Sequence, residues 1–151
     1  ILIEIQALVT NANYNTPQRN ETGFNYKRLG MLIAVLEKRM GLAMGTKDIF
    51  VNLVGGLKID DPAADLSIIS AIASSTMDKY IEKDIILCGE VGLTGEVRSI
   101  SHLNQRITEA LSLGFKKAIV PSYGMKEKLK NVDMDLYPVK NVKETFKILF
   151  H

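Results

Sequence analysis

The segment from Asp61 to Met77 constrains the fold of this chain more than any other. Asp61 precedes Pro62, a favoured pairing of a helix cap with a first helical residue. The helix that follows is apolar on nearly every side, through Leu66, Ile68, Ile69, Ala71, Ile72 and Ala73. Because a helix without a polar face must be buried on several sides, we expect it to lie at the centre of the domain.

Strand and helix patterns alternate around this helix. We predict strands at 2–9, 48–54, 85–90, 96–98, 118–121 and 135–139, and helices at 25–40, 63–77, 101–113 and 141–149. Asn25, Ser101 and Asn141 have the residue types and positions of helix N-caps. The polar segment 10–23 predicts a loop that builds no core. The chain is therefore expected to form a single α/β (α+β) domain over residues 1–151, with a mixed sheet and packed helices.

Composition excludes several classes of protein. A chain of 151 residues with 46% apolar content can bury one real core, and its net charge of +2 does not by itself indicate a nucleic-acid binder. One cysteine and two histidines allow neither a disulfide framework nor a zinc cluster. Cys88 lies in an apolar run, which predicts a buried, inert thiol.

The setting expected from this composition is a reducing one, hence the cytoplasm. No apolar run reaches the roughly 18 residues of a membrane span, and no signal-peptide pattern is present. The chain opens directly in a strand pattern, without an initiator methionine, which indicates a domain taken from a longer protein.

Two motifs carry most of the remaining information. Pro-Ala-Ala-Asp-Leu occupies residues 62–66, and Gly-Glu-Val-Gly-Leu-Thr-Gly-Glu-Val-Arg occupies residues 89–98. Further matching segments are 4–9, 16–19, 28–37, 52–57 and 114–121. In this order they resemble the proteolytic domain of the Lon family, and within it the C-terminal domain of the bacterial RadA (Sms) DNA-repair proteins. The resemblance covers essentially the whole chain.

The resemblance implies a fold like the second domain of ribosomal protein S5, which Lon proteases share. It also implies a longer parent protein in which a zinc finger and a RecA-like ATPase precede this domain, so that ATP, Mg and Zn would be cofactors of the parent. This chain contains neither a C-x-x-C pair nor a phosphate-binding loop, and we expect no cofactor in it. The implied partners are further copies in a hexameric ring, single-stranded or branched DNA, and a RecA-type recombinase, with no membrane.

The residues of the Lon serine/lysine dyad are replaced in this chain. The serine position corresponds to Ala63, the glycine two residues after it to Asp65, and the lysine position to Asn104. A methyl group is no nucleophile, and an amide is no base at neutral pH. We therefore expect a proteolytically inactive Lon-like domain of a RadA-type DNA-repair ATPase. The alternative is an active ATP-dependent Lon-like serine protease, with Ser67 and Lys58 as the neighbours that would replace the dyad.

Other polar residues near these motifs have simpler interpretations. Asp61 is expected to cap the helix, and Asp65 to favour the positive end of its dipole. Together with Asp60 they do not make a convincing metal site, and we predict none. His102 is interpreted as a surface or capping residue.

Two roles are open to an inactive domain. One is a scaffold that supports the ring of the parent protein. The other is a DNA-contacting surface, for which the local basic groups are the candidates: Arg19, Lys27, Arg28, Lys116 and Lys117. Lysines at exposed helix ends and turns are also ordinary solvated surface. Arg19 is the strongest individual candidate, because the family pattern keeps an arginine just after the Thr-Pro pair at 16–17.

Overall fold

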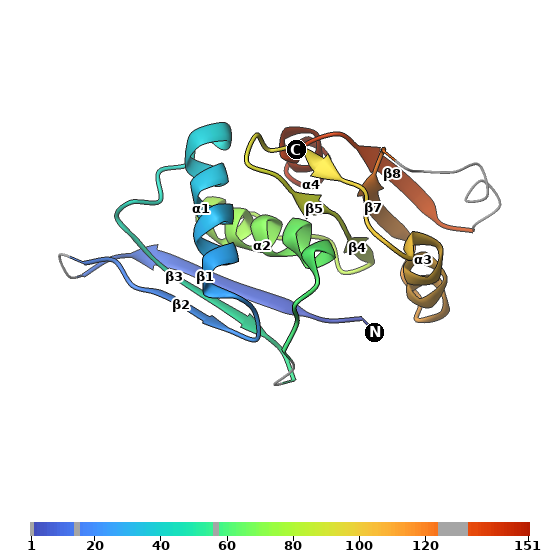
Figure 1. The fold of residues 1–151 in the computed structure, drawn as a ribbon, viewed down its shortest axis with the longest axis horizontal. Helices are drawn as coiled ribbons and strands as arrows, with labels where there is room; N and C mark the ends of the chain where they lie inside the picture. Colours follow the sequence, from blue (N-terminus) through green and yellow to red (C-terminus); the bar gives the residue numbers. More distant parts are fainter. Residues whose placement is uncertain (1, 14–15, 56–57, 124–132) are drawn as a thin grey trace.

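The computed structural model describes residues 2–13, 16–55, 58–123 and 133–151, which form four α-helices and three small sheets (Figure 1). The strands are β1 (Ile5–Asn11), β2 (Arg19–Thr22), β3 (Lys47–Leu53), β4 (Ile85–Leu87), β5 (Glu90–Val91), β6 (Val97–Arg98), β7 (Lys117–Pro121) and β8 (Asp135–Val139). The helices are α1 (Tyr26–Met40), α2 (Asp65–Met77), α3 (Leu103–Ser112) and α4 (Val142–Leu149), and a short 3-10 turn, η1 (Pro62–Ala64), leads into α2.

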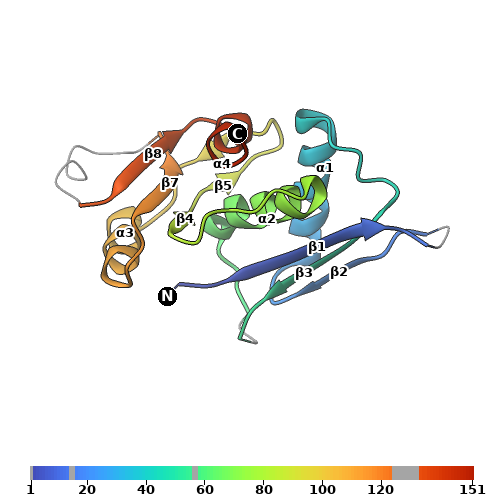
Figure 2. The same cartoon turned by 180° about the vertical axis from the view of Figure 1, so that it is seen from behind.

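The first sheet is mixed and has the order β1-β3-β2. Strand β1 runs antiparallel to β3, and β2 runs parallel to it. Helices α1 and α2 cover one face of this sheet (Figures 1 and 2). The prediction of a loop at 10–23 was wrong in two places, because β1 continues to Asn11 and β2 forms within the segment, although none of its described residues is buried. The parallel pairing of β2 with β3, which follows it by some 25 residues, supplies the hydrogen bonds that its polar sequence does not suggest.

The second sheet, β4-β7-β8, is entirely parallel and is covered on both faces. Side chains alternate along a strand, and in β7 Ala118 and Val120 pack with α3 residues Ile107 and Ala110, whereas Ile119 joins the central core. Strands β5 and β6 form a separate two-stranded hairpin. The α/β class is thus confirmed, with the strands divided among three small sheets.

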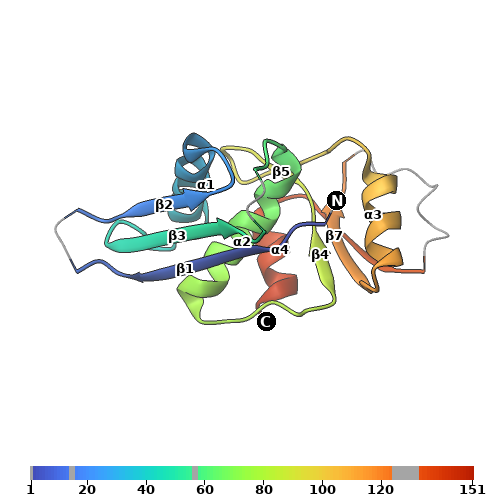
Figure 3. The same cartoon turned by 90° about the horizontal axis from the view of Figure 1, so that it is seen from below.

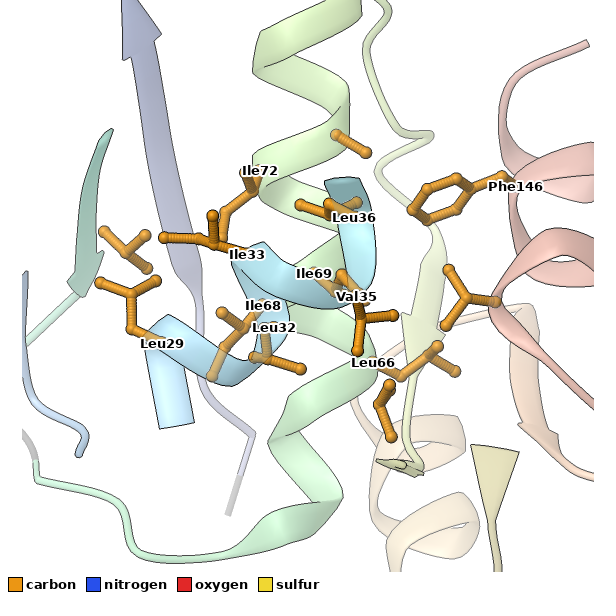
Figure 4. Packing of buried hydrophobic residues seen from close by; sticks show 14 of the residues in the cluster. Leu29, Leu32, Ile33, Val35, Leu36, Leu66, Ile68, Ile69, Ile72 and Phe146 are labelled. Carbon is orange, nitrogen blue, oxygen red and sulfur yellow. The ribbon is translucent and has the colours of Figure 1, made fainter. Parts of the chain in front are cut away.

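Helix α2 is the central element, as its sequence predicts. Leu66, Ile69 and Ile72 are fully buried. Figure 4 shows α1 residues such as Leu32 packed against α2, with Phe146 of α4 in the same cluster. Burying one such side chain stabilises the fold by about 1.5–3 kcal/mol, so α2 provides much of the free energy that holds the sheets together.

Three of the predicted helix caps are confirmed. The side chains of Asn25, Asp61 and Asn141 accept hydrogen bonds from backbone N–H groups in the first turns that follow them. The prediction of a Ser101 cap was wrong. The N-cap of α3 is His102, which has a left-handed backbone (φ 59°) and makes no side-chain capping bond. Histidine is among the residues that tolerate this conformation comparatively well.

Candidate functional site

The two motifs at 62–66 and 89–98 meet at the start of α2. The Gly89 N–H donates to the Ala63 carbonyl (3.0 Å), and the Leu66 N–H donates to the Gly89 carbonyl (3.1 Å). A Cβ atom on Gly89 would lie 2.7 Å from a methyl carbon of Val97, so a larger residue there would force the buried Val97 of β6 to shift.

A cavity of about 120 Å³ lies beside this contact. Its apolar lining comes from the N-terminal segment (Leu2), the approach to η1 (Ile59), Ala63 and β4 (Ile86). Figure 3 shows the N-terminal segment near β4 and β7, on the same side of the molecule as α3. The cavity is thus enclosed by segments that are far apart in the sequence.

The polar groups of the cavity are few and mostly paired. Arg106 of α3 donates to Asp61 over 2.9 Å, and both line the cavity. Burial works to raise the pKa of Asp61, but hydrogen bonds from the Ala63 N–H and from Arg106 outweigh it and hold that pKa below its usual value. Burial raises the pKa of the Cys88 thiol, also in the lining, to about 12, so this thiol is protonated and unreactive at neutral pH.

Of the two positions that the resemblance assigns to the dyad, Ala63 is buried in the cavity wall. Asn104 is exposed on α3, and among the described residues that line the cavity this helix contributes Arg106 and Glu109. Ser67 does line the cavity, but its hydroxyl donates to the Leu87 carbonyl (2.8 Å). Lys58, the other neighbour considered, is exposed and is not part of this described lining.

Asp65 has a larger role than its sequence position suggests. Its side chain is only 1% exposed, and it accepts hydrogen bonds from the Arg28 Nε (2.8 Å), from the second Arg28 nitrogen and from the Val91 N–H (3.0 Å). Glu90 lies 3.9 Å from the same guanidinium. The hydrogen bond to Asp65 raises the pKa of Arg28 further despite partial burial. One carboxylate thus ties α1, α2 and β5 together.

A sequence signal for this network existed. An acidic residue on a helix with no polar face must be buried, and a buried carboxylate requires a partner. The identity of the partner did not follow, because Arg28 precedes Asp65 by 37 residues and meets it only in the folded chain.

The five candidate DNA contacts do not form one surface. Arg19, Lys27 and Arg28 belong to β2 and α1, whereas Lys116 and Lys117 lie at β7, toward the other end of the molecule (Figure 1). Arg19 donates to the Met44 carbonyl (2.9 Å), and Lys117 pairs with Glu82 (2.6 Å). With Arg28 held by Asp65, Lys27 and Lys116 are the exposed members.

Comparison with known proteins identifies the family of this chain. Residues 37–151 match the family described as the Lon protease (S16) C-terminal proteolytic domain. The chain belongs to this family.

Its curated relatives include DNA repair protein RadA from several bacteria. The chain is 41% identical over 150 residues to RadA of Aquifex aeolicus, which it matches over 99% of its own length and 33% of the relative's. Identity to RadA of Bacillus subtilis is 42% over 147 residues (97% and 32% of the two chains), and to RadA of Chlamydia muridarum 38% over 151 residues (99% and 33%). The chain thus spans about a third of the length of these relatives and is homologous to their C-terminal third.

The residues that the structure describes contain no group of three histidine, cysteine or acidic side chains placed to hold a metal ion. No helix in this part of the chain is both long and apolar enough to cross a lipid bilayer.

Proposed function

We propose that this chain is a proteolytically inactive Lon-like domain of a cytoplasmic, RadA-type DNA-repair and recombination ATPase, in which it serves as an assembly scaffold. The observation that carries this proposal is the wall of the cavity at the start of α2. Ala63 replaces the nucleophile there, and the nearby hydroxyl of Ser67 already donates to a backbone carbonyl. A serine protease needs a hydroxyl in hydrogen-bond reach of a base, and Arg106 cannot act as one, because its guanidinium stays protonated.

Asp65 is a second argument against proteolysis. The Lon pattern has glycine here, and this chain fills the position with a buried carboxylate that binds Arg28 and the Val91 N–H. That backbone N–H is therefore engaged by the protein itself. Restoring only the dyad leaves this arrangement in place, and catalysis tolerates little displacement of its groups.

The test is a serine-directed fluorophosphonate probe. We expect no labelling of the natural chain and little peptidase activity in the double variant Ala63→Ser, Asn104→Lys. The control is an active Lon-type protease labelled under the same conditions. Labelling of the natural chain that disappears in Ser67→Ala would instead support the alternative, an active ATP-dependent Lon-like serine protease.

The name of the relatives supports a role in DNA repair for the parent protein. By the same resemblance, the parent would bind ATP, Mg and Zn in domains outside these residues. It would form a homo-oligomeric ring of six copies. It would act on single-stranded or branched DNA together with a RecA-type recombinase. The exposed Lys27 and Lys116 are the remaining candidates for direct phosphate contact by this domain.

DNA contact is tested by the salt dependence of binding. Removing one phosphate contact should lower the slope of log affinity against log salt by about 0.7–0.9. We expect this decrease for Lys27→Ala and for Lys116→Ala, with exposed Lys143→Ala on α4 as the control. Equal slopes in the natural chain and in the three variants would exclude Lys27 and Lys116 as phosphate contacts. Arg28→Ala is unsuitable, because it also breaks the ion pair with Asp65.

A further inference from the structure

The buried carboxylate of Asp65 is held in the way that a bound ligand is held. Its Oδ1 accepts a hydrogen bond from the Arg28 Nε (2.8 Å), and its Oδ2 accepts from the second Arg28 nitrogen and from the Val91 N–H (3.0 Å). A planar guanidinium that binds both oxygens gives a strong and specific carboxylate contact. Three donors thus converge on one carboxylate, which is only 1% exposed.

All three donors belong to elements other than the one that carries the acid. Arg28 lies on α1 and Val91 on β5, whereas Asp65 begins α2. Both elements are also held by contacts that do not involve the carboxylate, because Leu29 of α1 is buried in the central core and Val91 pairs with Val97 of β6. Removing the side chain of Asp65 therefore leaves the donors around a space that the missing atoms define.

This space is open to solvent on one side. The Arg28 side chain is 31% exposed, so a small ion reaches the donors past the guanidinium. Glu90, with a side chain that is 30% exposed, lies 3.9 Å from the same guanidinium. Glu90 and, more weakly, Asp60 are the other acidic groups whose charges act on Arg28. Glu90 therefore competes with an incoming anion.

We propose that Arg28 and the Val91 N–H form a carboxylate-binding site that the chain fills with its own Asp65. The site binds a free monocarboxylate of matching size once this side chain is shortened. In the natural chain it is closed to free ligands, because an acid tethered in place competes at a high effective concentration. This site does not depend on the proposed scaffold or DNA-contacting roles.

The atoms that a substitution removes decide which carboxylate fits. Asp65→Gly removes two carbons and two oxygens, which are the heavy atoms of acetate. Asp65→Ala keeps Cβ and removes one carbon and two oxygens, which are the heavy atoms of formate. A packed interior tolerates neither an empty space nor an added methyl group well. The two variants should therefore have opposite preferences between acetate and formate.

The test measures urea unfolding of both variants with added sodium acetate or sodium formate at neutral pH, with sodium chloride holding the ionic strength constant. A ligand that binds only the folded state lowers the unfolding equilibrium constant by about tenfold for each tenfold increase in its concentration above the dissociation constant. We expect this response to acetate in Asp65→Gly and to formate in Asp65→Ala. Acetamide has the shape of acetate without its charge, and it should have no such effect.

The matched control is the pair of Asp61 and Arg106. The Asp61 carboxylate likewise accepts from an arginine and from a backbone N–H, but its side chain is 45% exposed. Water competes for such exposed groups, so formate should not restore stability to Asp61→Ala.

Two double variants test the assignment of the donors. Asp65→Gly with Arg28→Met lacks the guanidinium and should lose the response to acetate. Asp65→Gly with Glu90→Gln lacks the competing charge and should bind acetate more tightly than Asp65→Gly alone. If Asp65→Gly is unfolded without ligand by circular dichroism, Asp65→Ala carries the test with formate, because alanine is the better helix former.

Saturable recovery that follows the size of the carboxylate would establish the site. A folded Asp65→Ala that does not respond to formate, or that responds equally to chloride, would overturn it. A saturable response of the natural chain to acetate would contradict the closure of the site by Asp65. These outcomes leave the scaffold and DNA-contacting roles to their own tests.

Discussion

Two arginine–aspartate pairs flank Ala63, and they differ in almost everything except chemistry. Arg28 and Asp65 meet in the interior, where the aspartate is 1% exposed and also accepts the Val91 N–H. Arg106 and Asp61 meet at the mouth of the cavity, where their side chains are 30% and 45% exposed. The inner pair joins three elements of the fold, and the outer pair closes a surface contact between η1 and α3. Burial, and not the kind of charge, decides how strongly each pair contributes to stability.

The largest expected effect comes from removing the inner carboxylate. Asp65→Ala leaves Arg28 without its main partner and the buried Val91 N–H without an acceptor. Breaking a buried pair costs about 3–5 kcal/mol, and we expect about 2–4 kcal/mol here, because Arg28 keeps some contact with water. Urea denaturation measures the loss. Asp65→Asn, which keeps an oxygen for Val91, should lose less stability. If Asp65→Ala lost less stability than any variant of the outer pair, the comparison would be refuted.

A smaller effect is expected at Asp61. Its carboxylate accepts from the Ala63 N–H (3.0 Å) as well as from Arg106, and loss of such a cap costs about 1 kcal/mol. Asp61→Ala should therefore unfold at lower urea concentration. Asp61→Asn keeps the cap and loses only the charge, so nearly natural stability in this control would assign the effect to the cap.

Arg106→Gln should have a still smaller effect. Exposed ion pairs contribute about 0.2–1 kcal/mol, and salt screens them. The difference between the natural chain and this variant should shrink as salt is added, whereas the Asp65→Ala difference should persist. A salt-independent loss at Arg106 would show that the outer pair is less exposed to solvent than its accessible area indicates.

The last effect is similar in size to that of Arg106→Gln and concerns pH and an acidic group outside both pairs. The hydrogen bond from Thr94, together with those from the backbone and Arg98, lowers the pKa of Glu96 from its ordinary 4.5 to about 2. A carboxylate whose pKa is lower in the folded state stabilises the fold above its unfolded pKa, and this is lost as pH falls from 4.5 toward about 2. Because Glu96 is partly exposed, we expect only about 0.5–1 kcal/mol. Parallel stability curves for the natural chain and Glu96→Gln over this range would contradict the prediction.

Much of the local structure near the site could be predicted from the sequence. Helix starts could be predicted at Asn25, Asp61 and Asn141, since each cap binds an N–H two or three residues away. The uniformly apolar sequence of α2 predicted that this helix is buried. Strand β2 gave no such signal, because four residues with polar side chains become a strand only when β3 supplies the pairing. His102 takes the cap position that was expected for Ser101, and nothing in the structure explains this shift of one residue.

The candidate site divides in the same way. The resemblance to the Lon family assigns Ala63 and Asn104 to the positions of the dyad, and on that assignment the residue types predict the loss of its nucleophile and base. The sequence also identifies Arg19 and Arg28 as candidates for DNA contact, but in the structure Arg19 donates to the Met44 carbonyl and Arg28 to Asp65. Guanidinium groups bind whichever acceptor folding brings near them, and that cannot be read from charge patterns.

The sequence by itself determined the central helix and its Asp-Pro start, because these depend on residue type and on contacts within one turn of chain. The tertiary structure alone decided that Asp65 would hold α1 to β5, that the strands would divide into three sheets, and that Ala63 would line a cavity. These features join residues tens of positions apart. They exist only once hydrophobic burial around α2 has brought those segments together.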